Sequence, residues 1–100
     1  MSDEAGLQSA GGCWRISGDL DFHTVPGLWR RVKHLLSMPS LVLNMEGVRA
    51  SNSAALVFLL EVIAEAGRKG TALTLEAVPE AVYEIARMYN ALDLLPPAQD

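Results

Sequence analysis

Several features that mark common protein classes are scarce or missing in this chain of 100 residues. Its single cysteine, Cys13, has no second thiol for an internal disulfide or a CxxC metal or redox site, which favours a reducing compartment. Eight basic residues against twelve acidic ones leave a net charge of -4, so sequence-independent binding to nucleic acid is not expected. The longest purely apolar run, residues 54–60, is far shorter than the roughly 18 residues that cross a bilayer.

The start of the chain also argues against a secretory signal. Its first residues, MSDEAGLQSAGG, contain neither a basic n-region nor an apolar h-region. Half of the residues are hydrophobic, which is enough for one domain with its own core, whereas the chain is too short for a second domain. We therefore expect a flexible tail over residues 1–11, one domain over 12–97 and a short tail over 98–100, in a cytoplasmic protein.

The usual motifs of catalysis and of cofactor binding are also absent. The chain contains no GxxxxGK[ST], GxGxxG or GxSxG segment, which argues against the common phosphate loops and the hydrolase nucleophile elbow. His23 and His34 lack the spacing and the accompanying ligands of a metal site. Asp19 and Asp21 are more typical of a turn than of an acid and base pair. We expect no enzyme activity, no cofactor and no metal.

What the sequence does contain is an alternation of strand and helix patterns. Strands and helices of this length predict an α/β fold, with helices covering at least one face of the sheet. A continuously apolar strand over residues 41–45 indicates burial on both faces. We expect the chain to begin with a hairpin of strands 13–17 and 20–22, joined at Gly18 and Asp19, followed by a helix capped by Thr24. Strand 41–45 and a helix opening at 52–55 come next. The chain then continues with strand 71–75, a helix at 80–89 and a short edge strand near 94–97.

The central helix, opening at residues 52–55 and ending at 67–70, shows the clearest periodicity. Leu56, Leu60, Ile63 and Ala64 recur on one side, and Asn52 or Ser53 can cap its first turn. The positive end of the helix dipole therefore carries a serine. That serine could be a nucleophile, a phosphoacceptor, a contact residue or only a cap, and a nucleophile would need a base that the motifs do not supply.

A second side of this helix, formed by Phe58, Val62 and Glu65, is also partly apolar. Two interpretations remain open: a neighbouring helix buries this side, or it forms a docking patch with a polar rim. The candidate partner-binding residues are Asn52, Ser53, Ala54, Phe58, Glu61, Val62 and Glu65. A basic face on the preceding helix, with Arg30, Arg31 and Lys33, is typical of a solvated surface, or it could meet an acidic partner or anionic headgroups.

Three segments together resemble a known family: ISGDLDFHTVPGLW, LVLNMEGVRASNSAALVFLL and TLEAVPEAVYEIARMYNALDLLPP. They are similar to the STAS domain, the fold of anti-sigma-factor antagonists, and more closely to the MlaB-type subunits of Mla phospholipid ABC transporters. The likeness covers nearly all of residues 13–97. It implies a mixed β-sheet with helices mainly on one face.

The resemblance also implies a function. Such a protein would be a non-catalytic cytoplasmic subunit, peripheral on the inner membrane through its transporter, which maintains the lipid asymmetry of the outer membrane. It would bind and support an MlaF-like ATPase and, through it, an MlaE-like permease and an MlaD-like lipid-binding subunit.

The family's D-[S/T]-x-G-L loop corresponds to Asn52, Ser53, Ala54, Ala55 and Leu56. Ser53 takes the place of the hydroxyl that is phosphorylated or contacts a partner, whereas Asn52 replaces the aspartate and Ala55 the glycine. The alternative to a transporter subunit is an anti-sigma-factor antagonist switched by phosphorylation of Ser53. The two replacements argue against that alternative, although a phosphate at a helix N-terminus would be electrostatically favourable.

Overall fold

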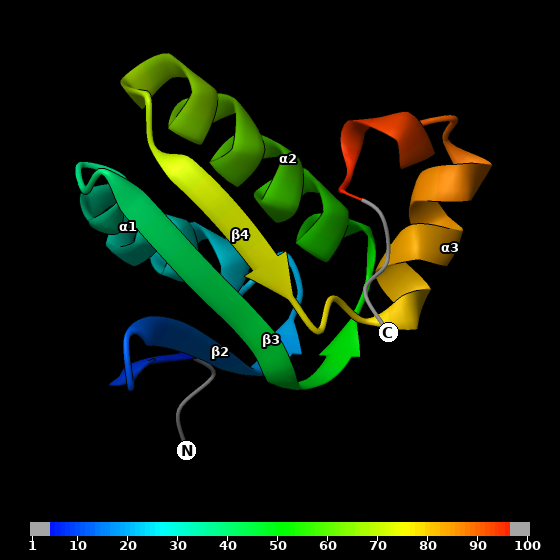
Figure 1. Ribbon diagram of the computed structural model, residues 1–100. Helices are drawn as coiled ribbons and strands as arrows, with labels where there is room; N and C mark the ends of the chain where they lie inside the picture. Colours follow the sequence, from blue (N-terminus) through cyan, green and yellow to red (C-terminus); the bar gives the residue numbers. More distant parts are fainter. Residues whose placement is uncertain (1–4, 97–100) are drawn as a thin grey trace.

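A four-stranded sheet in the order β1-β2-β3-β4 forms one layer of the protein, whose computed structural model describes residues 5–96. Strand β1 (Gly6–Ala10) pairs antiparallel with β2 (Cys13–Leu20), and β3 (Ser40–Ser51) and β4 (Ala72–Glu76) follow in parallel. The second layer contains the helices α1 (Val25–Leu35), α2 (Ser53–Lys69) and α3 (Glu80–Met88), with α2 between the other two (Figure 1). The predicted α/β fold with a mixed sheet is confirmed.

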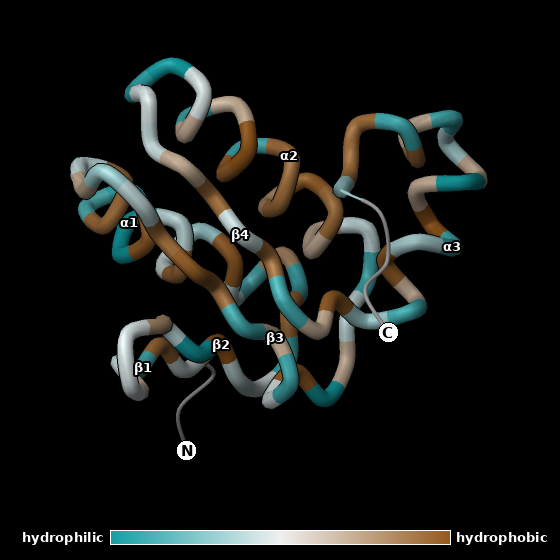
Figure 2. Tube along the Cα trace, viewed as in Figure 1, coloured by the Kyte–Doolittle hydropathy of each residue, from teal (hydrophilic) through white to brown (hydrophobic). Residues whose placement is uncertain are grey.

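The helices cover one face of the sheet, and β3 shows this most clearly. Leu41, Leu43 and Met45 are buried, whereas Val42 and Asn44 between them are only half-buried. The expectation that this strand is buried on both faces is therefore wrong. Its apolar run reflects one fully covered face and one half-covered face, and the hydrophobic residues continue along the facing helix α2 (Figure 2).

The amino-terminal hairpin differs from the prediction. Gly6–Ala10 form β1, where a flexible tail was expected, and the hairpin turn lies at Gly11 and Gly12, both with positive φ. Arg31 holds this strand to α1, because its guanidinium donates to the Ala5 carbonyl oxygen at 2.6 Å. Strand β2 does not turn at Gly18 but continues to Leu20, since pairing with the long strand β3 satisfies its backbone through two register shifts.

The carboxyl-terminal part of the domain is helical where an edge strand was predicted. Asn90 adopts a left-handed conformation with φ of 58°, and the N–H of Ala91 donates to the Ala86 carbonyl oxygen, so α3 ends in a tight turn. Residues Leu92–Leu94 then form one turn of 3₁₀ helix, and Leu95 is buried against the core. The predicted tail over 98–100, like the first four residues and Pro97, lies outside the described residues.

Candidate functional site

The start of α2 lies where two parallel strands end side by side. Leu20, the last residue of β2, pairs with Ser51, the last residue of β3, and the N–H of Asn52 donates to the Leu20 carbonyl oxygen at 3.3 Å. The loop over residues 21–24 and the first turn of α2 therefore leave the sheet at the same edge. The carboxyl ends of parallel strands are a common location for binding sites in α/β proteins.

Asn52, rather than Ser53, caps α2. Its side-chain oxygen Oδ1 accepts a hydrogen bond from the Ala54 N–H at 2.8 Å, which satisfies one of the free donors of the first turn. Ser53 is the first helical residue and is half-buried, and its hydroxyl makes no hydrogen bond to another described residue. Within residues 5–96, the Ser53 hydroxyl is thus without a hydrogen-bond partner.

The neighbouring loop is held by a reciprocal set of hydrogen bonds. The Asp21 carboxylate accepts from the N–H groups of His23 and Thr24 at 2.8 and 3.0 Å, and the Thr24 hydroxyl accepts from the Asp21 N–H. These backbone donors, that of Thr24 above all, hold the pKa of Asp21 below its usual value. Asp21 is therefore a turn former, as predicted, whereas Thr24 does not cap α1 through its side chain.

The predicted docking patch on α2 is not on the surface. Ala54, Phe58 and Val62 are each at most 1% exposed and Glu65 is 7% exposed. The apolar patch expected there is thus wrong, and packing by neighbouring helices is the interpretation that holds. Its physical reason is that α2 contacts α1 on one flank and α3 on the other, so both flanks are covered as well as the side facing the sheet.

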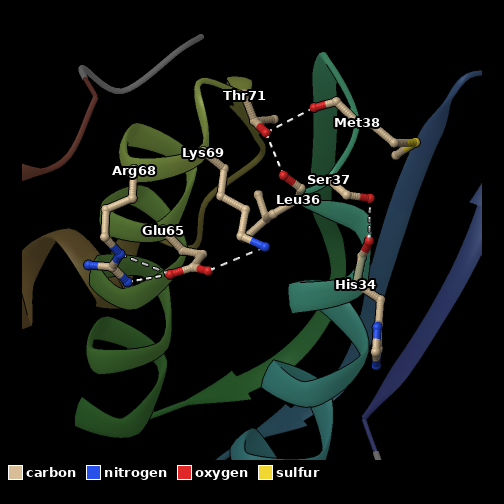
Figure 3. A network of polar contacts seen from close by, with 8 residues as sticks. All are labelled: His34, Leu36, Ser37, Met38, Glu65, Arg68, Lys69 and Thr71. Atoms are coloured by element: carbon tan, nitrogen blue, oxygen red, sulfur yellow. Dashed lines mark hydrogen bonds and ion pairs between the residues drawn. The ribbon is translucent and has the colours of Figure 1, made fainter.

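Glu65 is engaged within its own helix. Its carboxylate accepts from the Arg68 guanidinium, with Nε at 3.1 Å, and lies 3.8 Å from the Lys69 ammonium (Figure 3). The hydrogen bond from Arg68 is the main reason that the pKa of Glu65 is lowered. Glu65 thus belongs to a charge network at the end of α2, far along the helix from Ser53.

The surface that α2 does present was only partly identified from the sequence. Asn52 and Glu61 are exposed and Ser53 is half-buried, so all three have the solvent access that a docking role requires. That they bind a partner stays a prediction. Sequence reasoning missed Val57, which is 51% exposed and follows Ser53 by one helical turn, and Phe22, which is 64% exposed in the adjoining loop. The sequence did contain a signal for Val57, because a residue at i+4 from Ser53 lies on the same side of the helix. We call Phe22, Asn52, Ser53, Val57 and Glu61 the docking surface.

The described part of the chain contains neither a candidate metal centre nor a membrane span. No three or more histidine, cysteine, aspartate or glutamate side chains gather there in a way that could hold a metal ion. Among the described helices, none has the length and apolar character needed to cross a bilayer.

Comparison with solved structures defines the class of fold. An anti-sigma-factor antagonist from Mycobacterium paratuberculosis superposes with a TM-score of 0.70 at 19% identity, over 96% of this chain and 85% of the other. The anti-sigma-factor antagonist SpoIIAA in its unphosphorylated form superposes with a TM-score of 0.65 at 16% identity, over 96% and 87%. At such low identity these likenesses establish the fold alone, which this chain shares with anti-sigma-factor antagonists.

Sequence comparison narrows the class further. The chain belongs to the STAS domain family, because the family model described as "Mlab, STAS domain" matches residues 5–96. It is 28% identical over 97 residues to the intermembrane phospholipid transport system binding protein MlaB of Escherichia coli K12, covering 96% of this chain and 99% of the relative. The protein of the same name from Shigella flexneri matches equally well. The resemblance inferred from the sequence is confirmed.

Proposed function

We propose that this chain is a non-catalytic subunit of a phospholipid ABC transporter and binds the transporter's ATPase through the docking surface. The observation that carries this proposal is the match to MlaB over nearly the whole length of both chains. A relative named as a binding protein of a phospholipid transport system, and as small as this chain, supports a role as a bound subunit. The proposal places the chain on the cytoplasmic side of the inner membrane, in a system that maintains outer-membrane lipid asymmetry.

The docking surface has the chemistry that such contacts use. Phe22 in the adjoining loop and Val57 one helical turn after Ser53 offer exposed apolar area, and burial of such side chains supplies most of the binding energy of an interface. Asn52 and Glu61 supply a polar rim. The N-terminal end of α2 carries a partial positive charge, which favours a carboxylate or a carbonyl oxygen from the partner.

Support of the ATPase needs no chemistry in this chain. A subunit that binds one conformation of the ATPase more tightly than the others increases the population of that conformation. The rigid packing of α2 between α1 and α3 presents the docking surface as a fixed shape, which suits such selection. Contacts with the permease and the lipid-binding subunit then follow through the ATPase.

A second candidate function is that of an anti-sigma-factor antagonist switched by phosphorylation. The observation that favours it is the half-buried Ser53 at a helix N-terminus, where a phosphate would be electrostatically stabilised and where no described residue bonds the hydroxyl. Asn52 argues against it, since its amide is engaged in the cap and cannot offer the carboxylate of the family's loop.

Purification from the native host separates the two candidates. The tagged chain is extracted from membranes in mild detergent, and the proteins that accompany it are identified by mass spectrometry. We expect an ABC ATPase, a permease and a lipid-binding subunit in fixed proportion. Recovery from the soluble fraction with a serine kinase, together with a phosphate mass on Ser53, would establish the signalling function instead.

Substitutions within the docking surface test the site itself. Ser53→Arg and Val57→Lys place charge in a contact that becomes desolvated, and we expect each to weaken ATPase binding by about tenfold or more. Met88→Lys is the matched control, since Met88 is 75% exposed on α3 outside the docking surface. ATPase binding unchanged in Ser53→Arg and Val57→Lys would show that the partner docks elsewhere.

A further inference from the structure

A basic cleft lies at the other end of the helical layer. It has a volume of about 490 Å³ and is bordered by one face of α1 with the turn after it, and by the end of α2. Within α1, Arg30, Lys33 and His34 are spaced at i, i+3 and i+4, which places them along one side of that helix. The lining residues are Arg30, Lys33, His34, Ser37 and Lys69. We call this the basic cleft.

Positive charge in the cleft exceeds the negative charge that faces it. Glu65 is the carboxylate at its border, and Arg68 and Lys69 share it (Figure 3). Lys33 contributes to lowering the pKa of Glu65, so its charge also acts on this side of the helices. Within residues 5–96, no ion pair involves Arg30 or Lys33.

Positive charge is concentrated around the cleft, whereas the rest of the chain is negatively charged. Arg30, Lys33, Arg68 and Lys69 with Glu65 amount to a local charge of +3 in a chain whose net charge is -4. The rest of the chain holds four basic residues against eleven acidic ones, a net charge of -7. An anion that approaches the protein is therefore attracted more strongly to this region than to the remainder of the chain taken together.

Compensation of helix dipoles explains only part of this arrangement. Lys33 and Lys69 lie in the last turns of α1 and α2, where cations stabilise the negative helix end. Arg30 lies before the last turn of α1, where the dipole effect has fallen off, and it also lines the cleft. Dipole compensation also gives no reason for a concave surface.

We propose that the basic cleft binds a phosphate group carried by a lipid headgroup or by a soluble phosphate ester. A guanidinium and two ammonium groups around a concave surface suit a tetrahedral oxyanion, and the cleft is large enough for an ester such as glycerol phosphate. The site goes beyond the proposed function. Since α2 has 17 residues and is thus about 25 Å long, Ser53 and the cleft residue Lys69 lie at its opposite ends.

Two probes and a matched pair of variants test this site. The first probe is glycerol 3-phosphate, titrated against the labelled protein while the amide signals of α1 are followed by NMR. The second is a vesicle of phosphatidylglycerol and phosphatidylcholine, compared in cosedimentation with a vesicle of phosphatidylcholine alone. The test variant is Arg30→Gln/Lys33→Gln, and the control is Arg15→Gln/Arg49→Gln, which removes two exposed cations on β2 and β3.

The expected result is that the wild-type chain and the control bind, whereas the test variant binds about tenfold more weakly. Binding to the anionic vesicle alone identifies a lipid headgroup, and binding to glycerol 3-phosphate identifies a soluble ester. The proposal is overturned if the wild-type chain binds neither probe, or if the control is weakened as much as the test variant. No ATPase takes part, so failure here leaves the proposed function untouched.

Discussion

The Leu20 carbonyl oxygen accepts a hydrogen bond from the N–H of Asn52 at 3.3 Å. This bond joins the end of β2 to the residue that caps α2, although the two residues are far apart in the chain. It brings the loop that carries the exposed Phe22 next to the helix start that carries Ser53. This junction thus brings Phe22 close to the part of the docking surface that α2 carries.

The cap at this junction can be tested by its effect on stability. Asn52→Ala removes the acceptor for the Ala54 N–H, and we expect the free energy of unfolding to fall by about 1 kcal/mol in urea denaturation. Asn52→Asp keeps an oxygen in place and adds a negative charge at the positive helix end, so it should be at least as stable as the wild type. Equal losses in both variants would show that the side-chain bond does not stabilise the helix.

The loop before α1 predicts a dependence of stability on pH. Asp21 is held below the ordinary aspartate pKa of 3.8, mainly by the backbone N–H of Thr24, so the folded state binds its proton less readily than the unfolded state. Its contribution to stability is fully present above pH 3.8 and is lost as the pH falls through the folded-state pKa.

This dependence is measured by urea unfolding at a series of acidic pH values. We expect Asp21→Asn to reduce the loss of stability on acidification. Glu84→Gln is the control, since Glu84 is exposed on α3 and its carboxylate accepts no hydrogen bond from another described residue. An acid sensitivity of Asp21→Asn identical to that of the wild type would contradict the assignment of Asp21.

Thr71 connects the end of α1 to the start of β4. Its buried hydroxyl lies 2.6 Å from the Leu36 carbonyl oxygen and 2.9 Å from that of Met38 (Figure 3). Thr71→Val keeps the shape but leaves the Leu36 carbonyl without this donor, which should cost about 1 to 3 kcal/mol of the free energy of unfolding. Thr74→Val, on the exposed side of β4, should change stability little. A similar loss of unfolding free energy in both variants would show that the loss does not come from the Thr71 hydrogen bond.

Substitution by alanine should have opposite effects on stability at two of the glycines. A Cβ on Gly47 of β3 would lie 2.9 Å from the Ser17 Cβ and 3.1 Å from the Ile16 carbonyl oxygen, so Gly47→Ala should destabilise the protein by about 1 to 3 kcal/mol. Gly67 of α2 has no neighbouring atom within 4 Å of such a Cβ, and Gly67→Ala should stabilise the helix by up to about 1 kcal/mol. Thermal unfolding of the two variants measures the contrast, and a stabilising Gly47→Ala would contradict the close approach of β2 and β3.

Local patterns in the sequence predicted those parts of the molecule that local interactions decide. The three helices and strands β3 and β4 were identified because hydrophobic periodicity, caps and prolines act over a few residues. The position of Ser53 at a helix start followed in the same way. Asn52 before α2 and Gly70 after it are typical helix-capping residues, so the sequence alone predicted where that helix begins and ends.

Non-local pairing decided the amino-terminal half. A turn at Gly18 and Asp19 satisfied the local rules, yet β2 runs through both residues because the long strand β3 lies beside it and supplies its hydrogen bonds. Likewise, the segment over residues 6–10 has little apolar character of its own, and it becomes a strand because β2 offers an edge to pair with.

The sequence by itself determined an α/β chain of the STAS family with a capped helix that presents a serine at its start. Only the tertiary structure decided which side of that helix faces solvent. Apolar residues occur almost all around α2, so periodicity cannot distinguish Phe58, which is buried, from Val57, which is exposed. The packing of two helices against a third made that distinction, and the junction of Leu20 with Asn52 added Phe22 to the same surface.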